Sequence, residues 1–536
     1  MNTIIPPQRA FFRSGATLDI NFRRQMLQKL QAALAKWEKP LADALWADLH
    51  KSYEEAYLTE LSIVRGEITN HLRHLGRWSK RRRKSTPLKM FPSRSYIVSE
   101  PLGNTLIMAP WNYPVQLLLN PLVGAISAGC TAVLKPSPYV PAVSSVLREM
   151  IEDTFDPQYI AIVLGNRDVN QALLAHRFDL IFFTGSPSLG KIVMEAASRH
   201  LTPVVLELGG KSPCIVDRTA DISTAAKRVA WGKTLNSGQT CIAPDYLLIH
   251  EEVKEAFVKE FAKAVRELHG TDIKEHRHYV RMVSDRAFTR VKGYLAQGDI
   301  LYGGRTDEHE RFIEPTLLDM HISLGDADAD AKASSHEVLT EEIFGPVLPV
   351  LTFNNIADVA GYITRREKPL AFYYFGREAD GWSIIRHTSS GGACINDTII
   401  HLATSRMGFG GVGESGICMG TVIADGCIRI SNPTTYPLLT FLCAALLNMF
   451  VPSGGGHWAI QAPIMFTAGA DLGVDPGLTG TAIAWGDAWT NLIQPFWALP
   501  ALAIAKLSAR DIMGYCLVDL FITGAIICGG LVVWAL

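Results

Sequence analysis

Cys241 lies in a small polar segment, residues 236–246, with the sequence NSGQTCIAPDY. A cysteine thiolate is a strong nucleophile and a good leaving group, so a thiol in this setting could form and release a covalent adduct with a carbonyl carbon. The alternative is structural, because an unpaired cysteine often fills space as a small buried apolar side chain. The cysteine alone does not decide between these two roles.

Two further segments carry groups that such a thiol would need in order to oxidise an aldehyde. That reaction needs donors for the oxyanion of the tetrahedral adduct and a base that activates water. Glu207 ends the strand-like run PVVLEL before two glycines, where its carboxylate could be the base. Asn112 lies in APWNYP, between two aromatic residues and two prolines, which suits a rigidly held amide donor. A glutamate exposed in a turn and a plain turn asparagine are the structural alternatives.

A glycine-rich turn offers a place for a phosphate. In FFTGSPSLGK, residues 182–191, Gly185, Ser186 and Gly190 follow an apolar strand and precede a helix. Backbone N–H groups at such a helix start can bind phosphate oxygens. The spacing differs from the GxGxxG fingerprint, so by itself the turn is only an indication of nucleotide binding.

The elements that would position these residues alternate along the chain. Residues 18–80 have the apolar spacing of helices, and short apolar runs with polar or glycine turns then follow, among them TAVLKPS, IAIVLGN and LIFFTGS. This alternation continues to about residue 398 and predicts an α/β fold built on parallel sheets. The acidic, alanine-rich residues 325–336 are predicted to be a surface insertion or a flexible loop.

Composition excludes several classes of function. A net charge of −1 argues against nucleic acid as a principal partner. The basic run KRRRK, residues 80–84, is interpreted as a solvated helix end, with a phosphate or lipid-headgroup contact as the alternative. The nine cysteines show neither CxxC nor Cys/His ligand spacing, so no disulfide framework and no metal site is expected. These features suit a cytoplasmic catalytic part, and the N-terminus lacks the apolar core of a signal peptide.

The C-terminal part of the chain has a different composition. Of 51 lysines and arginines, only Lys506 and Arg510 follow Arg429. Residues 512–536 contain a single acidic residue, Asp519, and as a helix would be about 37 Å long. That length could span a bilayer, so the tail is predicted to be a membrane-associated, apolar helical segment. A buried hairpin in a soluble protein is the alternative.

Taken together, eight segments resemble the aldehyde dehydrogenase superfamily, in the branch of class 3, fatty-aldehyde and coniferyl-aldehyde enzymes. They cover about residues 20–416 in the family's order: PWNYP, KPS, FTGS, LTPVVLELGGKSP, WGKTLNSGQTCIAPDY, EEIFGP, EKPLAFYYF and FGGVGESG. The resemblance implies an aldehyde-dehydrogenase-like fold with two Rossmann-like domains. It also implies oxidation of an aldehyde, as a small-molecule substrate, to the carboxylic acid with NAD(P)⁺, through a cysteine thiohemiacetal and a thioester.

The resemblance also implies residue roles. Cys241 would be the nucleophile, Glu207 the general base, and Asn112, with the Cys241 backbone N–H, the oxyanion hole. The residues implied to contact the cofactor are Lys135 and Glu342 at the ribose hydroxyls, Phe344 beside the nicotinamide ribose, and Trp111, Gly185 and Ser186 along the cleft. The family often has a glutamate where this chain has Pro138. NADP⁺ could therefore be accepted, although NAD⁺ is expected first.

Domain boundaries follow from the same resemblance. They are an NAD(P)-binding domain over 1–206, with an oligomerisation segment near 85–105, a catalytic domain over 207–405, a junction over 406–424 and a tail over 425–536. The tail resembles the end of bacterial short-chain fatty acid transporters, through FVPSGGGHWAIQAP, AIAWGDAWTNLIQPFWALPALAIA and RDIMGYC. It replaces the family's terminal dimer strand, which leaves the homodimer open. The alternative function is a transporter-derived membrane protein with an accessory or inactive dehydrogenase domain, a fusion product.

Overall fold

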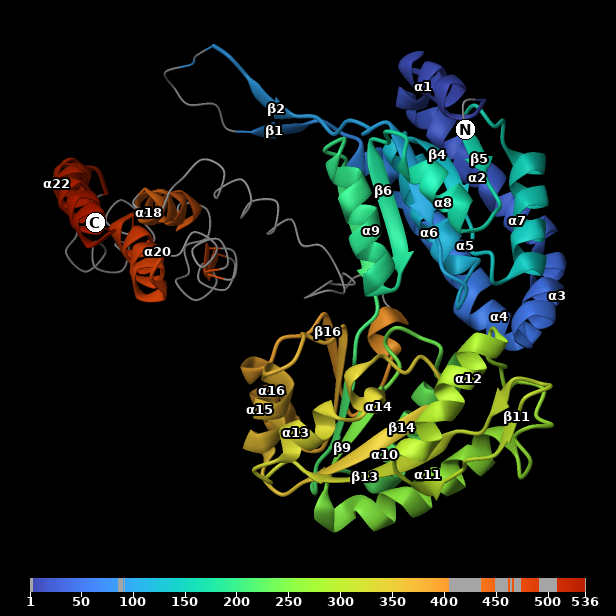
Figure 1. Cartoon of the computed structure of the whole chain (residues 1–536). Coiled ribbons are helices and arrows are strands. Elements are labelled where there is room, and N and C mark those ends of the chain that lie inside the picture. The colour runs from blue at the N-terminus through green and yellow to red at the C-terminus, as the bar shows by residue number, and fades with distance from the viewer. Residues whose placement is uncertain are drawn as a thin grey trace. The chain divides into compact units, whose positions relative to one another are not determined.

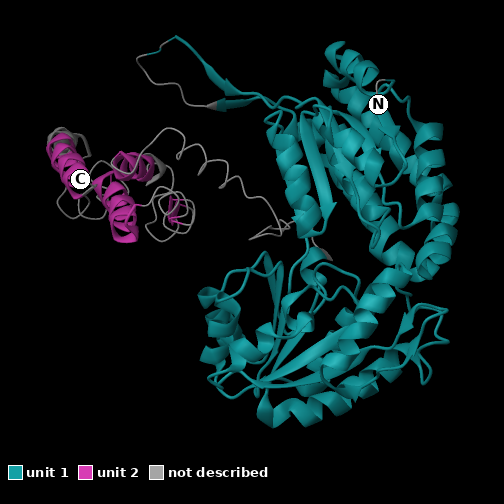
Figure 2. Ribbon diagram, in the orientation of Figure 1, with its two compact units in different colours: residues 1–416 teal, residues 417–536 magenta. Residues whose placement is uncertain are grey.

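The computed structural model describes residues 3–84, 90, 92–403, 435–448, 461–462, 465–466, 474–490 and 509–535. The chain divides into two compact units, Met1–Gly416 and Ile417–Leu536 (Figure 2). The first unit holds two β-sheets with helices packed around them (Figure 1). The predicted junction over 406–424, and the place of the family's terminal dimer strand, lie outside the described residues.

A group of helices precedes the first sheet. It comprises α1 (Ile5–Arg13), the short turn η1 (Ala16–Leu18), α2 (Ile20–Lys36), α3 (Glu38–Leu49), α4 (Tyr53–Ala56), the π-turn η2 (Tyr57–Leu61) and α5 (Ser62–Trp78). Leu27, Leu30 and Leu34 recur at intervals of three and four on α2, and all are fully buried in the core of the first sheet. Apolar side chains at this spacing lie on one face of a helix, which can then pack against the core. The helical prediction for residues 18–80 is confirmed.

The first sheet has five parallel strands in the order β5-β4-β3-β6-β7. Their bounds are β3 (Asn104–Met108), β4 (Thr131–Lys135), β5 (Ile160–Ile162), β6 (Leu180–Gly185) and β7 (Val204–Leu208), joined by α6 (Gln116–Ala128), α7 (Pro141–Thr154), α8 (Arg167–Leu174) and α9 (Pro187–Ser198). Every residue of β3 and β4 is buried. Continuous burial is what a parallel sheet covered on both faces requires.

The second sheet has seven strands in the order β10-β13-β14-β9-β8-β15-β16, of which only the edge strand β10 runs antiparallel. The strands are β8 (Pro213–Val216), β9 (Tyr246–His250), β10 (Asp299–Tyr302), β13 (Thr316–Ser323), β14 (Val347–Phe353), β15 (Ala371–Phe375) and β16 (Gly392–Ile395). The helices around it are α10 (Ile222–Thr234), α11 (Lys254–His269), α12 (Asp285–Tyr294), α13 (Ala329–Ser334), α14 (Glu337–Thr340), α15 (Ile356–Thr364) and α16 (Glu378–His387). The predicted α/β fold with parallel sheets is therefore confirmed.

Short elements complete the first unit. They are the 3₁₀ turns η4 (Leu235–Gly238), η5 (Glu251–Val253), η6 (Leu295–Gln297) and η7 (Ile400–Ala403), the hairpin of β1 (Arg82–Lys84) with β2 (Ser95–Ile97), and that of β11 (Thr306–Asp307) with β12 (Phe312–Ile313). The interpretation of residues 80–84 as a helix end is wrong for its last three residues. Helix α5 ends at Trp78, and Arg82–Lys84 pair as a strand with Ser95–Ile97.

The two sheets present opposite strand ends to one another. Strand β7 ends at Leu208, and two glycines, Gly209 and Gly210, lead almost directly into β8. The chain thus passes from the carboxyl end of a strand in the first sheet to the amino end of a strand in the second. The amino ends of β8 and β9 lie side by side, because Pro213 pairs with Tyr246. This connection places residues that follow the strands of the first sheet near residues that precede the strands of the second sheet.

The second unit contains α18 (Tyr436–Asn448), α20 (Pro476–Thr490) and α22 (Ala509–Ala535). Tyr436, Phe441 and Ile483 are buried in a small core of its own. Among the residues that the structure describes, no helix is both long and apolar enough to cross a membrane. The predicted span over 512–536 is therefore not supported.

Candidate active site

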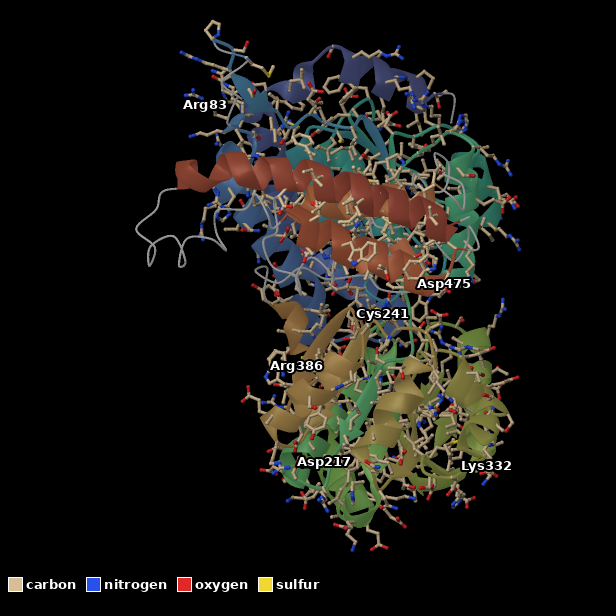
Figure 3. All side chains as sticks on the ribbon, turned by 90° about the vertical axis from the view of Figure 1, so that its left-hand side faces the viewer. Arg83, Asp217, Cys241, Lys332, Arg386 and Asp475 are labelled. Carbon is tan, nitrogen blue, oxygen red and sulfur yellow. The ribbon has the colours of Figure 1, made fainter. Side chains whose placement is uncertain are left out.

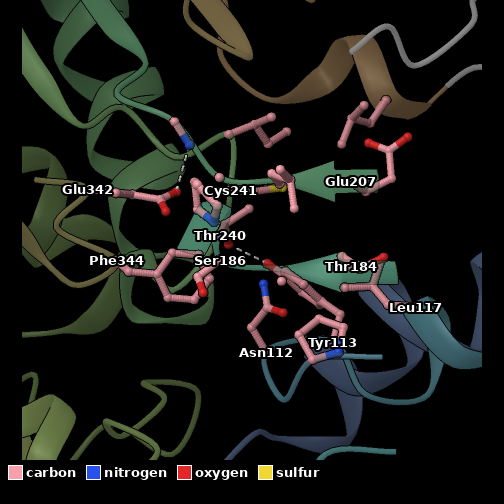
Figure 4. Close-up of a pocket in the computed structure, with 18 of the residues that line it drawn as sticks. Asn112, Tyr113, Leu117, Thr184, Ser186, Glu207, Thr240, Cys241, Glu342 and Phe344 are labelled. Carbon is pink, nitrogen blue, oxygen red and sulfur yellow. Dashed lines mark hydrogen bonds between the residues drawn. The ribbon is translucent and has the colours of Figure 1, made fainter. Parts of the chain in front are cut away.

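A large cavity of about 2330 Å³ opens within the first unit, where the two sheets present their strand ends. Eight of the nine predicted site residues line it, and Figure 4 shows most of them around Cys241. They are Trp111, Asn112, Gly185, Ser186, Glu207, Cys241, Glu342 and Phe344. In Figure 3, Cys241 lies at mid-height of the molecule, whereas Asp217 and Lys332 lie toward one end. Residues spread over more than two hundred positions of sequence therefore share one cavity.

Cys241 follows a tight turn that needs unusual backbone angles. Asn236 and Ser237 have φ of 51° and 54°, in the left-handed region that costs a side-chain-bearing residue free energy. Gly238 has φ of 71°, and a Cβ there would overlap the carbonyl of Gly345. A strained turn that is fully buried is characteristic of functional sites. Burial, together with the charges of Glu342 and Glu207, raises the pKa of the Cys241 thiol to about 12.

Glu207 is the penultimate residue of β7, at the carboxyl edge of the first sheet. Burial raises the pKa of its carboxyl group to about 7. Its Oε2 atom is buried and has no hydrogen-bond partner among the described residues. A carboxyl group without a partner, in a cavity and with a pKa near neutrality, can exchange a proton with a bound water or substrate.

Asn112 is 3% exposed and lies in the turn between β3 and α6. Its Nδ2 donates to the carbonyl of Gln239, with 3.0 Å between the two atoms. An amide nitrogen carries two protons, so this contact holds the side chain and leaves one proton for a ligand. Gln239 is two residues before Cys241, and the bond therefore ties the amide to the segment that carries the thiol.

Glu342 and Phe344 precede β14 and reach the cavity from the second sheet. Glu342 Oε1 accepts a hydrogen bond of 3.2 Å from the backbone N–H of Gly210, which Figure 4 shows as a dashed line. Burial raises the pKa of this carboxyl group to about 8. Phe344 has φ of 49°, and its ring meets that of Trp111 edge-on, with the centroids 5.3 Å apart. The two rings thus contact across the cavity from different sheets.

The segment before Phe344 is held by an ion pair. Lys211 Nζ contacts the carboxylate of Asp245 and donates to the carbonyls of Val338 and Glu341, at 2.9 and 2.7 Å. Asp245 in turn accepts from the backbone N–H of Ile343 at 3.1 Å. These bonds attach residues 338–343 to the amino ends of β8 and β9, and so set the position of Glu342.

The glycine-rich turn is placed at the cavity as predicted. Ser186 is the N-cap of α9, its hydroxyl accepts from the Leu189 N–H, and Pro187 occupies the first helical turn. Gly185 and Ser186 both line the cavity, so the N-terminus of α9, the positive end of its dipole, borders it. This arrangement, the Glu342 carboxylate and the cavity's size fit a dinucleotide.

Lys135 differs from the other eight predicted residues. It ends β4 at the same sheet edge, but it is 2% exposed and is not among the residues that line the cavity. Its Nζ donates to the carbonyl of Pro136 at 2.7 Å, and burial lowers the pKa of its amine to about 8. The structure therefore brings its backbone to the sheet edge that carries the site, and the Pro136 carbonyl takes one of the three ammonium protons.

Residues 325–336 were predicted to be an insertion or flexible loop, and part of this segment is helical. Ala329 and Ala333, one helical turn apart, are buried under α13, while Lys332 pairs with Asp328. Asp330, Ala333 and Ser334 line the cavity. The i,i+4 spacing of the two alanines was the signal for this helix, and the acidic composition obscured it.

The cavity also has an apolar side that the sequence did not reveal. Large apolar side chains of the cavity wall are strongly exposed, with Leu58 at 60%, Leu102 at 58% and Ile400 at 50%. Ile63 and Leu402 add to the same wall. Exposed apolar surface gathered at one cavity, rather than scattered, indicates a ligand with an apolar part.

Comparison with known proteins decides the family. The pattern of the aldehyde dehydrogenase family matches residues 3–434. The chain belongs to the aldehyde dehydrogenase family. The match confirms the predicted reaction class, NAD(P)-dependent aldehyde oxidation, and it extends beyond the predicted residues 20–416.

Individual relatives agree with this assignment. The chain is 44% identical over 412 residues to the 4,4'-diaponeurosporen-aldehyde dehydrogenase of Staphylococcus aureus, which covers 76% of this chain and 87% of that protein. It is 42% identical over 410 residues to human aldehyde dehydrogenase family 3 member B1, covering 76% and 85%. A solved structure of Staphylococcus aureus AldH in its substrate-bound state superposes with a TM-score of 0.74 and 43% identity, covering 78% of this chain and 89% of that one. The predicted class 3 branch is confirmed.

A second family pattern, that of the short chain fatty acid transporters, matches residues 400–534. It overlaps the end of the aldehyde dehydrogenase match and agrees with the predicted resemblance of the tail. The helices α18, α20 and α22 lie within it. The cavity-lining residues in the described part of the chain all precede residue 403, and none of the described tail residues is among them.

Proposed function

We propose that this aldehyde dehydrogenase uses Cys241 as its nucleophile, Glu207 as its general base and Asn112 as its oxyanion donor. The observation that carries the proposal is that these three side chains, from three separate segments, line one cavity. The Cys241 thiolate adds to the aldehyde carbonyl, and the Asn112 amide, with the Cys241 backbone N–H, stabilises the oxyanion of the thiohemiacetal. Glu207 then removes a proton from the water that hydrolyses the thioester, which releases the acid and the thiol.

NAD(P)⁺, when bound, supplies the acceptor for the hydride that leaves the thiohemiacetal carbon. The N-terminus of α9 with Gly185 and Ser186 would hold its phosphates, Glu342 a ribose hydroxyl pair, and Phe344 and Trp111 the region of the nicotinamide ribose. Lys135 would contribute a second contact to the ribose hydroxyls, since its ammonium gives one of its three protons to the Pro136 carbonyl and keeps two. Pro138 leaves no carboxylate to repel a 2′-phosphate, so NADP⁺ is accepted beside the preferred NAD⁺.

The substrates that suit the cavity are lipophilic aldehydes. Leu58, Leu102 and Ile400 give its wall an apolar character, and burying apolar area contributes roughly 25 cal/mol per Å² to binding. The Staphylococcus aureus relative named for 4,4'-diaponeurosporen-aldehyde supports the same choice. Medium-chain and long-chain aliphatic aldehydes and aromatic aldehydes are therefore the first substrates to test.

The organisation proposed for the chain keeps the predicted boundaries: a cofactor domain over 1–206, a catalytic domain over 207–405 and the tail from 425. Strand β2 falls within the segment near 85–105 that was predicted to serve oligomerisation, and we propose a homodimer formed through the hairpin that β2 makes with β1. A cytoplasmic catalytic part with a membrane-associated tail remains a prediction. The transporter-derived alternative is disfavoured, because the dehydrogenase part retains all three reactive groups.

The test is cofactor reduction by the full-length protein. NAD⁺ and NADP⁺ are offered in turn with hexanal, a long-chain aldehyde and benzaldehyde, and absorbance at the reduced cofactor's wavelength is followed. If the wild-type protein turns over and Cys241→Ala does not, the thiol mechanism is supported. The matched control is Cys214→Ala, which changes a buried cysteine of the second sheet. Turnover that survives in Cys241→Ala would refute it.

A further inference from the structure

The first unit contains an ion pair that is sealed from solvent. Lys51 Nζ and Glu60 Oε1 are 2.7 Å apart, and both side chains are 0% exposed. Removing two charges from water costs several kcal/mol per ion, and their attraction often does no more than offset that cost. Stability alone therefore does not explain the pair, and its remaining contacts indicate what else it does.

Those contacts are to the backbone around Asn112. Lys51 Nζ donates to the carbonyl of Asn112 itself, at 3.0 Å. Glu60 Oε2 accepts from the backbone N–H groups of Val115 and Gln116, at 2.8 and 3.3 Å. Each partner thus makes further hydrogen bonds to the turn that carries the amide.

The local structure explains why this turn needs such support. Helix α6 begins at Gln116, and its N-cap, Val115, has no side chain able to accept from the first N–H groups. Glu60 supplies the missing acceptor and places a negative charge at the positive end of the helix dipole. Glu60 reaches this position from the π-turn η2, an irregularity that is frequent at functional sites. Lys51 also lies over the ring of Tyr113, 4.4 Å from its centroid.

The same turn is bonded to the segment of the thiol. Asn236 Nδ2 donates both to the Asn112 carbonyl and to the Gln239 carbonyl, each at 3.0 Å. Gln239 O is also the acceptor for Asn112 Nδ2. The Asn112 carbonyl therefore accepts hydrogen bonds from both Lys51 and Asn236. The position of the Asn112 amide relative to Cys241 depends on both bonds.

We infer that Lys51 and Glu60 are positioning residues for the oxyanion donor: the pair fixes the turn at Asn112 so that the free amide proton faces the oxygen of the carbonyl group that Cys241 attacks. The inference rests on the proposed role of Asn112. It assigns to the pair no contact with substrate or cofactor. Misplacing a reacting group by about 1 Å can cost roughly a hundredfold in rate, which makes the position of the donor worth maintaining.

The experiment is a double-mutant cycle on the full-length enzyme. One arm is Lys51→Met/Glu60→Gln, which removes both charges and so leaves no unpaired ion, and the other arm is Asn112→Ala. We expect the pair variant to lower kcat roughly ten- to a hundredfold, with the KM for NAD⁺ unchanged. Asn112→Ala should lower kcat roughly 10²- to 10³-fold. In the Asn112→Ala background the pair variant should cost less than about threefold, because the group that it positions is gone.

The matched control is a less buried ion pair away from the cavity. Lys254 contacts Asp319 between α11 and β13, and Lys254→Met/Asp319→Asn should leave kcat at the wild-type value. If Lys51→Met/Glu60→Gln does not melt cooperatively, Lys51→Arg replaces it, since a guanidinium keeps the charge but moves the donor to the Asn112 carbonyl.

Each outcome points to one conclusion. Multiplicative losses in the combined variant, or a pair variant with wild-type kcat, would overturn the positioning role while Asn112 keeps its own. An Asn112→Ala enzyme with wild-type kcat would instead refute the proposed oxyanion donor, and the positioning role with it. If each variant lowers kcat and the two losses do not multiply in the combined variant, the inference is supported.

Discussion

The carboxylate of Glu342 accepts a hydrogen bond from the backbone N–H of Gly210, 132 positions earlier in the chain. Gly210 belongs to the link between β7, which ends with Glu207 and Leu208, and β8. The carboxylate proposed for the cofactor is therefore attached to the same short link as the proposed base. A change at this link is expected to disturb cofactor binding before it disturbs the fold.

Gly209→Ala tests this link. A Cβ at Gly209 would overlap the Glu342 carboxylate, which must move to make room. We expect the KM for NAD⁺ to rise roughly tenfold with a smaller change in kcat, the pattern of lost ground-state binding. Gly293→Ala on α12 is the control, because nothing lies within 4 Å of a Cβ there. An unchanged KM in Gly209→Ala would show that the Glu342–Gly210 contact does not serve the cofactor.

The reactivity of Cys241 should respond to the two nearby carboxylates. Their negative charge disfavours the thiolate, so Glu342→Gln is expected to lower the pKa of the thiol from its raised value of about 12. The alkylation of Cys241 by iodoacetamide, without cofactor, can be followed by mass spectrometry of its peptide. In Glu342→Gln the alkylation rate should reach half of its maximum at a lower pH than in the wild type. Glu378→Gln on α16 serves as the control. A pH profile that does not move would argue against electrostatic coupling between Glu342 and Cys241.

The pH dependence of turnover should report Glu207. A general base acts in its ionised form, and the pKa of Glu207 is raised to about 7, so kcat should increase as the pH rises through about 7. Glu207→Gln is expected to remove this limb and to lower kcat roughly 10²- to 10⁴-fold. Steady-state rates between pH 5.5 and 9 at saturating NAD⁺ provide the measurement. If the limb persists in Glu207→Gln, another group supplies the base.

Lys211→Met tests the support of the Glu342 segment. The substitution removes the donor to two carbonyls, Val338 and Glu341, and leaves Asp245 without its cation. We expect a destabilisation of about 1–3 kcal/mol, measured by chemical denaturation, together with a higher KM for NAD⁺. Lys227→Met, which removes an exposed ion pair with Glu267, is the control for stability. If the Lys211→Met enzyme is destabilised but keeps the wild-type KM for NAD⁺, this lysine has only a structural role.

Sequence alone was enough to propose the residues that react. Cys241, Glu207 and Asn112 stand in short motifs with glycine, proline and aromatic neighbours, and such motifs define local geometry within a few residues. The parallel sheets were equally accessible, because strands such as Thr131–Lys135 are apolar at almost every position and are followed by turn residues. These signals are local, and one chain is enough to detect them.

Long-range contacts were not accessible in this way. Lys51 and Glu60 stand among many charged residues of a helical region, and nothing near them distinguishes a sealed ion pair from a solvated one. Their partners, Asn112 and Val115, are more than fifty positions away. The direction of the Lys135 ammonium was inaccessible for the same reason: its strand and sheet edge follow from the sequence, but its rotamer depends on what packs around it.

Among the residues that the structure describes, all those that line the cavity come before residue 403, and the segment that matches the transporters follows almost entirely after them. Ribosomes make proteins from the N-terminus, so every reactive group leaves the exit tunnel before the tail has been synthesised. The dehydrogenase part can then begin to fold around its own sheets while the apolar tail is still being translated. In evolutionary terms, the C-terminal end of this chain is a position where one gene segment can replace another without rewriting the catalytic residues.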